Sequence, residues 1–102
     1  MRHRSLSGLL RVTLASVGNP DHAQPADRSL PGVPSETVEI SDLAAASHTC
    51  RAYIERHHLG AGNWAGGIVT RAGVPIARVS YNGRVWAPGS WEPGDQPLYD
   101  PQ

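Results

Sequence analysis

The chain has 102 residues, which is enough for one domain, and its net charge is zero. Its hydrophobic content of 39%, diluted by 11 Gly and 9 Pro, allows only a small core. No apolar run reaches the length of a membrane-spanning helix, so we expect no membrane partner. The single cysteine, Cys50, cannot form an intramolecular disulfide, which favours a reducing compartment, and we expect a cytoplasmic protein.

The charged residues are unevenly spread along the chain. All 9 cationic residues are Arg, and Lys and Phe are absent, a bias typical of a GC-rich, bacterial genome. Residues 51–84 hold five arginines against one glutamate, a local excess of four positive charges, while the flanking segments are acidic. This asymmetry is compatible with a polyanion site, although acidic flanks can also neutralise it.

The first third of the chain differs from the rest. Its beginning is rich in Arg and Ser like a targeting segment, but Arg11 interrupts the apolar stretch, which favours a flexible tail. Residues 19–35 are rich in Pro, Asp, Ser and Gly, the composition of a linker. We therefore expect residues 1–35 to be a flexible N-terminal segment and residues 36–99 to form a small α+β domain.

Apolar residues at helical spacing predict a helix over residues 42–58. Ser41 is suited to cap its N-terminus, and Asp42 in the first turn interacts favourably with the helix dipole. Two histidines suit the last turn, and Gly60 supplies a left-handed residue after the helix. The apolar face is predicted to consist of Leu43, Ala46, Cys50, Tyr53, Ile54 and His57.

The segment 67–87 predicts three antiparallel strands joined by two short turns. Asn82-Gly83 is the stronger turn signal, because both residues tolerate the positive φ of a two-residue type I′ turn. That turn makes Val79 and Trp86 cross-strand neighbours. Ala72-Gly73 is expected to form the other two-residue turn. The predicted fold is α+β, with one helix packed on a small three-stranded antiparallel meander in the order α-β-β-β.

Strand alternation assigns these side chains to two faces. A longer first turn would shift the register and exchange the faces of the first strand. The face expected to hold the helix carries Ile68, Ala77, Val79, Tyr81 and Trp86. The other face carries Val69, Arg71, Ile76, Arg78, Ser80 and Val85.

The apolar part of that second face motivates our leading functional hypothesis. Val69, Ile76 and Val85 would face water in a monomer. We therefore expect a non-enzymatic interaction or regulatory module that binds a protein partner, or a second copy of itself, through its sheet.

A nucleic-acid-binding regulatory protein is the first alternative. Arginines on a β-ribbon beside aromatic side chains can contact phosphates and stack on bases. The neutral charge of the whole chain weighs against this reading. The candidate binding residues are Arg71, Arg78, Arg84, Tyr81 and Trp86.

A small enzyme of unknown chemistry is the second alternative. His48 and Cys50 point to different sides of a helix, about 200° apart. Cys50 and His57 lie two turns apart, about 10.5 Å, beyond hydrogen-bond reach. No carboxylate pair is placed for acid–base catalysis. We therefore expect no catalytic residue, no metal and no cofactor.

Overall fold

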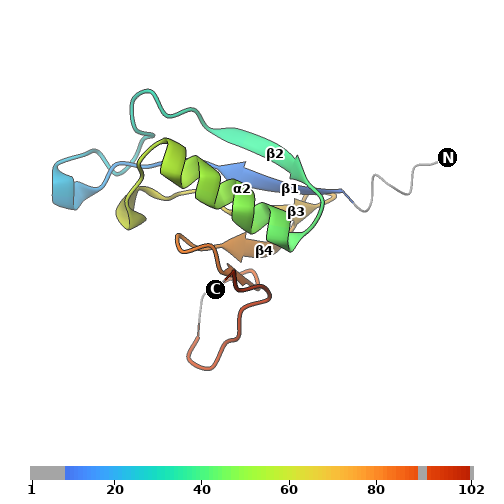
Figure 1. The fold of residues 1–102 in the computed structure, drawn as a ribbon. Helices are drawn as coiled ribbons and strands as arrows, with labels where there is room; N and C mark the ends of the chain where they lie inside the picture. The colour runs from blue at the N-terminus through green and yellow to red at the C-terminus, as the bar shows by residue number, and fades with distance from the viewer. Residues whose placement is uncertain (1–8, 90–91, 102) are drawn as a thin grey trace.

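The computed structural model describes residues 9–89 and 92–101. Five strands form one antiparallel sheet in the order β2-β1-β3-β4-β5, and one α-helix lies across one of its faces (Figure 1). The α+β class is confirmed, but the three-stranded meander is an undercount. The elements in chain order are β1 (Leu10–Leu14), the short 3-10 helix η1 (Pro20–His22), β2 (Glu36–Ile40), α2 (Leu43–Arg56), the 3-10 helix η2 (Ala61–Asn63), β3 (Ile68–Arg71), β4 (Val74–Val79) and β5 (Val85–Trp86).

β1 lies inside the segment that we expected to be flexible. It pairs with β2 on one side and with β3 on the other. Its three apolar side chains are buried, whereas Arg11 is exposed between them. Arg11 therefore does not interrupt the apolar pattern, because a strand turns alternate side chains to opposite faces. We expected residues 1–35 to be flexible, whereas the structure places Leu10–Leu14 in the sheet; residues 1–8 lie outside the described part of the chain.

The connection between β1 and β2 is tied to the rest of the domain despite its linker-like composition. The Ser16 hydroxyl accepts a hydrogen bond from the Leu30 N–H at 3.0 Å. The buried side chain of Asn63 donates to the Val17 carbonyl and to Gln24 Oε1, each at 3.0 Å. The first bond joins the two ends of the connection, and the two Asn63 bonds attach it to η2.

The helix α2 begins one residue later and ends two residues earlier than predicted. Asp42, and not Ser41, caps it, because the Asp42 carboxylate accepts a hydrogen bond from the Ala45 N–H at 2.8 Å. The left-handed residue after the helix is His58, at φ 54°, instead of Gly60. No helix within residues 9–89 and 92–101 is long and apolar enough to cross a membrane.

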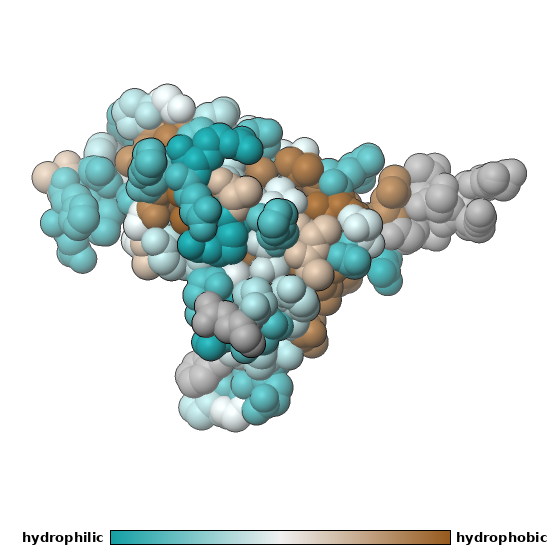
Figure 2. Space-filling model, viewed as in Figure 1, coloured by the Kyte–Doolittle hydropathy of each residue, from teal (hydrophilic) through white to brown (hydrophobic). Residues whose placement is uncertain are grey.

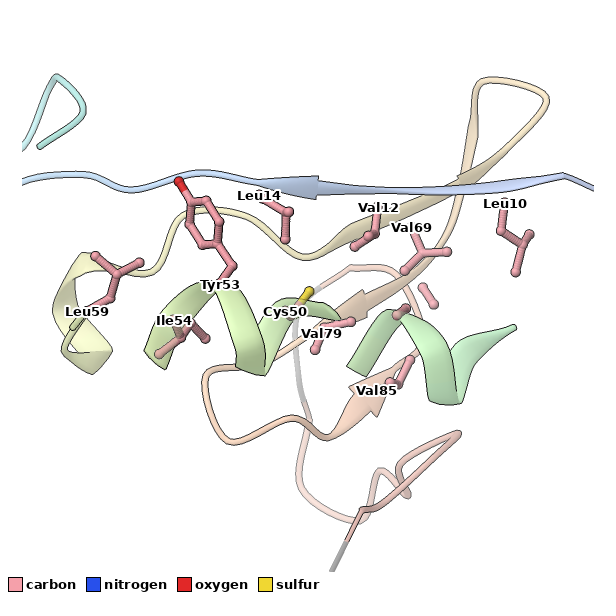
Figure 3. Close-up of a cluster of buried hydrophobic side chains, with 12 residues drawn as sticks. Leu10, Val12, Leu14, Cys50, Tyr53, Ile54, Leu59, Val69, Val79 and Val85 are labelled. Atoms are coloured by element: carbon pink, nitrogen blue, oxygen red, sulfur yellow. The ribbon is translucent and has the colours of Figure 1, made fainter. Parts of the chain in front are cut away.

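The core lies between α2 and the sheet. Figure 3 shows Val12 and Val69, from neighbouring strands, directed toward the side of the helix that carries Cys50 and Tyr53. All four of these side chains are at most 1% exposed. Burying one valine side chain contributes on the order of 2 kcal/mol, so β1 and β3 both stabilise the fold substantially.

The β3–β4 hairpin turns at Ala72-Gly73 as predicted, but its register differs. A bulge next to Pro75 makes Val69, instead of Ile68, the partner of Ala77. Proline has no N–H to donate to the ladder, which favours an irregularity at this point. Val69 therefore enters the core, and Ile68 is 40% exposed on the other face.

The β4–β5 hairpin has a three-residue loop, Tyr81-Asn82-Gly83. The Gly83 N–H donates to the Ser80 carbonyl at 2.9 Å, and the Ser80 N–H donates to the Arg84 carbonyl at 2.9 Å. Gly83 has φ 91°, whereas Asn82 does not adopt a positive φ. These features describe a β-turn followed by a glycine bulge, so the hairpin is confirmed and the two-residue loop is wrong.

The longer loop displaces the β4–β5 register by one residue. Val79 pairs with Val85, and Arg78 pairs with Trp86. The prediction that Val79 and Trp86 are cross-strand neighbours is therefore wrong. Val85 points into the core and is 0% exposed, whereas Trp86 turns to the opposite face together with Arg78.

The two edges of the sheet differ. At the β5 edge, the Val85 N–H donates to the Tyr99 carbonyl at 2.9 Å, and the Leu98 N–H donates to the Val85 carbonyl at 2.6 Å. The C-terminal segment thus covers β5. At the other edge, β2 pairs with β1 on its inner side and with no other strand of the described residues. Figure 1 shows β2 along the upper rim of the molecule.

Candidate interaction surface

The side of the sheet that faces away from α2 is named here the open face. Strand pairing and alternation place polar and charged residues on it, together with the exposed Ile68. The opposite side of the molecule, seen in Figure 2, shows mostly hydrophilic side chains over α2. The open face consists of Arg11, Thr13, Thr37, Glu39, Ile68, Thr70, Arg78 and Trp86.

The apolar second face that motivated our leading hypothesis is not present in this form. Val69 and Val85 are 0% exposed in the core. Ile76 is half-buried and packs against the same core. The register displacements in the two hairpins explain the difference, because a shift of one residue turns a side chain to the other face. Ile68 and Trp86 take the places on the open face that we assigned to Val69 and Val85.

Arg78 and Trp86 lie beside each other on the open face. The Arg78 guanidinium lies 6.0 Å from the centre of the Trp86 ring. Its Nε donates to the Gly89 carbonyl at 2.9 Å, and the indole N–H of Trp86 donates to the Ser80 hydroxyl at 3.3 Å. The sequence assigned these two residues to opposite faces, whereas the structure brings them together.

The other candidate residues lie elsewhere. Tyr81 lies on the helix side, where its hydroxyl donates to the Leu59 carbonyl at 3.1 Å and the Arg51 guanidinium lies 5.3 Å from its ring centre. Arg84 pairs with Asp100 at 3.2 Å. The five candidates therefore do not form one continuous site.

The remaining charges of the sheet are distributed in the same scattered way. Arg71 is exposed at the end of β3, beside the turn to β4. Arg11 pairs with Glu39 at 3.3 Å on the open face, and both side chains are about half exposed or more, at 49% and 61%. Such an exposed ion pair contributes about 0–1 kcal/mol, but it balances the local charge. The open face is therefore mixed in charge and not strongly basic.

Cys50 is the one cysteine of the chain, and its thiol is buried beneath α2. Burial raises the pKa of this thiol from 9.0 to about 12. The thiolate, which is the nucleophilic form, is therefore scarcely populated at neutral pH. His57 gives no help, since its Nε2 atom is buried without a hydrogen-bond partner and its ring packs against Tyr53.

This pKa shift predicts a loss of stability at alkaline pH. The folded protein holds the Cys50 proton more tightly than the unfolded chain, so the stabilising effect is complete below pH 9 and declines from there to about pH 12. The slope is about 1.4 kcal/mol per pH unit. Urea denaturation of the wild type and of Cys50→Ala, at neutral pH and at pH 11, measures the loss in the free energy of unfolding.

We expect the wild type to lose more stability than Cys50→Ala over this range. The free energy of unfolding of the variant still declines with pH, but less steeply, because burial and the charge of Glu36 also raise the pKa of Tyr53. Equal losses in the two proteins would contradict the assignment to Cys50.

The described residues contain no pocket and no group of three or more metal-ligating side chains. No family model, curated protein or solved structure matches the chain. Within residues 9–89 and 92–101, the parts of the sheet that no helix or strand covers are the open face and the β2 edge. The sequence missed the open face because the signals that decide it are the two hairpin registers. The strand β2 could have been predicted from the alternation of Glu36–Ile40, but its place at the edge follows only from the sheet order.

Proposed function

We propose that the protein is a small non-enzymatic interaction module that binds a protein partner, in the simplest case a second copy, through its sheet. The observation that supports this most is the incomplete cover of the sheet. α2 covers one face, whereas the second face and the β2 edge have no covering element among the described residues. A strand without a neighbour presents unpaired backbone groups, which favour pairing with another chain.

The composition and order of the open face also support binding. Trp and Arg are the side chains most enriched at the energetic centres of protein interfaces. The Arg78 guanidinium lies over the Trp86 ring, and each of the two side chains makes a hydrogen bond. Less side-chain entropy is lost on binding when such groups are ordered beforehand. The exposed Ile68 adds apolar area on the same face.

The two alternatives receive less support. Nucleic-acid binding depends on accumulated positive charge, yet Arg84 is paired with Asp100 and Arg11 with Glu39. Thiol-based catalysis needs a thiolate, which the raised pKa of Cys50 suppresses.

Light scattering coupled to size exclusion tests the proposal. The molecular mass should rise from 10.9 kDa toward twice that value as the concentration increases to about 1 mM. A monomer over the whole range would contradict the proposal for a second copy as partner. A parallel titration with duplex DNA at low salt should show no binding, and salt-dependent binding there would favour the nucleic-acid alternative.

A further inference from the structure

The β2 edge differs from the β5 edge in what remains unpaired. The C-terminal segment supplies hydrogen-bond partners to Val85 on β5. The outer side of β2 has no strand beside it within the described residues. Protected edges are usually short, twisted, covered or charged; β2 is a regular, uncovered strand of five residues whose charges are Glu36 and Glu39. The sheet can therefore be extended at β2, whereas at β5 the backbone groups of Val85 are already bonded to the C-terminal segment.

Apolar side chains are left partly exposed at this same edge. Val38 and Ile40 lie on the helix-facing side of β2, and Leu43 lies in the first turn of α2. All three pack against the core, but none of them is fully buried. Figure 2 shows hydrophobic surface beside α2. A strand added at β2 would cover these side chains and continue the core across the edge.

A second copy of β2 fits this edge. In an antiparallel pair centred on Val38, that residue meets its own counterpart, Glu36 meets Ile40, and Thr37 meets Glu39. No carboxylate then lies directly opposite another carboxylate. Glu39 is in addition paired with Arg11 of its own chain at 3.3 Å.

The neighbouring register is unfavourable. A shift of one residue in either direction turns the two helices to opposite sides of the sheet, and in one direction it also places Glu36 opposite Glu39. The register centred on Val38 keeps both helices on one side, so the partly exposed apolar side chains of both copies meet. Centring on Glu39 would place two carboxylates opposite each other, and centring on Thr37 would leave Ile40 outside the pairing. The register centred on Val38 is therefore the one that pairs all five residues of β2 without opposing carboxylates.

We propose that two copies of the chain pair antiparallel through β2, centred on Val38, and form one continuous sheet. This inference rests on the proposed function, and it names the partner and the surface. The open face then stays outside the contact between the copies.

Charge substitutions on the twofold axis test the pairing. Val38→Glu and Val38→Lys each place like charges opposite each other. The dimer dissociation constant of each variant should therefore be higher than that of the wild type by a factor of about ten or more. An equimolar mixture should restore the association, because Glu then meets Lys. Circular dichroism checks that each variant is folded, and light scattering measures the mass. Restoration on mixing could not result from unfolded variants.

A second variant covers the case in which a charge at this position prevents folding. Val38→Cys changes little in size and places two thiols on the twofold axis, while Cys50 stays buried. Oxidised glutathione should convert this variant to a disulfide-linked dimer. Ile68→Cys, on the open face, should form far less of it.

The outcomes separate the two proposals. If the wild type forms a dimer that Ile68→Glu disrupts and Val38→Glu does not, the β2 pairing is overturned and the proposed function stands. The pairing is also overturned if the wild type associates but Val38→Cys forms no disulfide-linked dimer. A wild type that remains monomeric at every concentration overturns the β2 pairing and the second copy as partner, and it leaves a different protein as the partner of the proposed module.

Discussion

Val12→Asp is expected to abolish folding. Val12 is 0% exposed and lies in the interior strand β1, between Val38 of β2 and Val69 of β3. A carboxylate there would be buried without a partner, which costs several kcal/mol, comparable with the total stability of about 5–15 kcal/mol of a small domain. Circular dichroism and thermal unfolding should show no cooperative transition.

Val74→Asp is the matched control. Val74 is also a valine in a strand, but it is 60% exposed next to a turn. We expect this substitution to change the free energy of unfolding by about 0.5 kcal/mol or less. If Val12→Asp unfolded at the same temperature as Val74→Asp, β1 would not be an integral part of the sheet.

Gly67→Ala is expected to remove much of the stability. Gly67 has φ 97°, and a methyl group there would lie 2.3 Å from the Val79 carbonyl oxygen. Its N–H donates to Thr13 and its carbonyl accepts from Val79, both at 2.7 Å, so the residue connects β1 to β4. Because neither backbone can move away freely, we expect a loss of about 3 kcal/mol or more in urea denaturation.

Gly73→Ala separates the two causes of this loss. Gly73 has φ 80°, but nothing lies within 4 Å of an added methyl group. This variant therefore reports the conformational cost alone, about 1–2 kcal/mol. The difference between the two variants measures the close approach at Gly67, and equal losses would show that the approach has no energetic effect.

The helix could be predicted from the sequence because its signals are local. Apolar residues at helical spacing and an acidic N-cap lie within one segment, and the observed ends differ by one or two residues. β1 also carries a local signal, since LRVTL alternates between apolar and polar residues. Arg11 was interpreted as a break in an apolar run, although a strand of period two requires a polar residue there.

The registers of the hairpins could not be predicted in the same way. Asn82-Gly83 fits a two-residue loop and a three-residue loop equally well, because glycine can occupy the left-handed position in both. The choice decided whether Val85 or Trp86 entered the core, and both residue types favour strands. The composition of the open face depends on this choice, so local sequence signals located the hairpin but not which side chains lie on each face.

The position of β1 has a consequence for how the chain folds. The two hairpins of β3, β4 and β5 form between neighbours in the sequence, and they can close rapidly. The first strand instead meets β3 across a long separation, as in the bond from the Ile68 N–H to the Thr13 hydroxyl, 55 residues away. Closing such a loop costs entropy before the contact stabilises anything, which slows folding. The arrival of the N-terminal strand is therefore expected to be the late, rate-limiting event of folding.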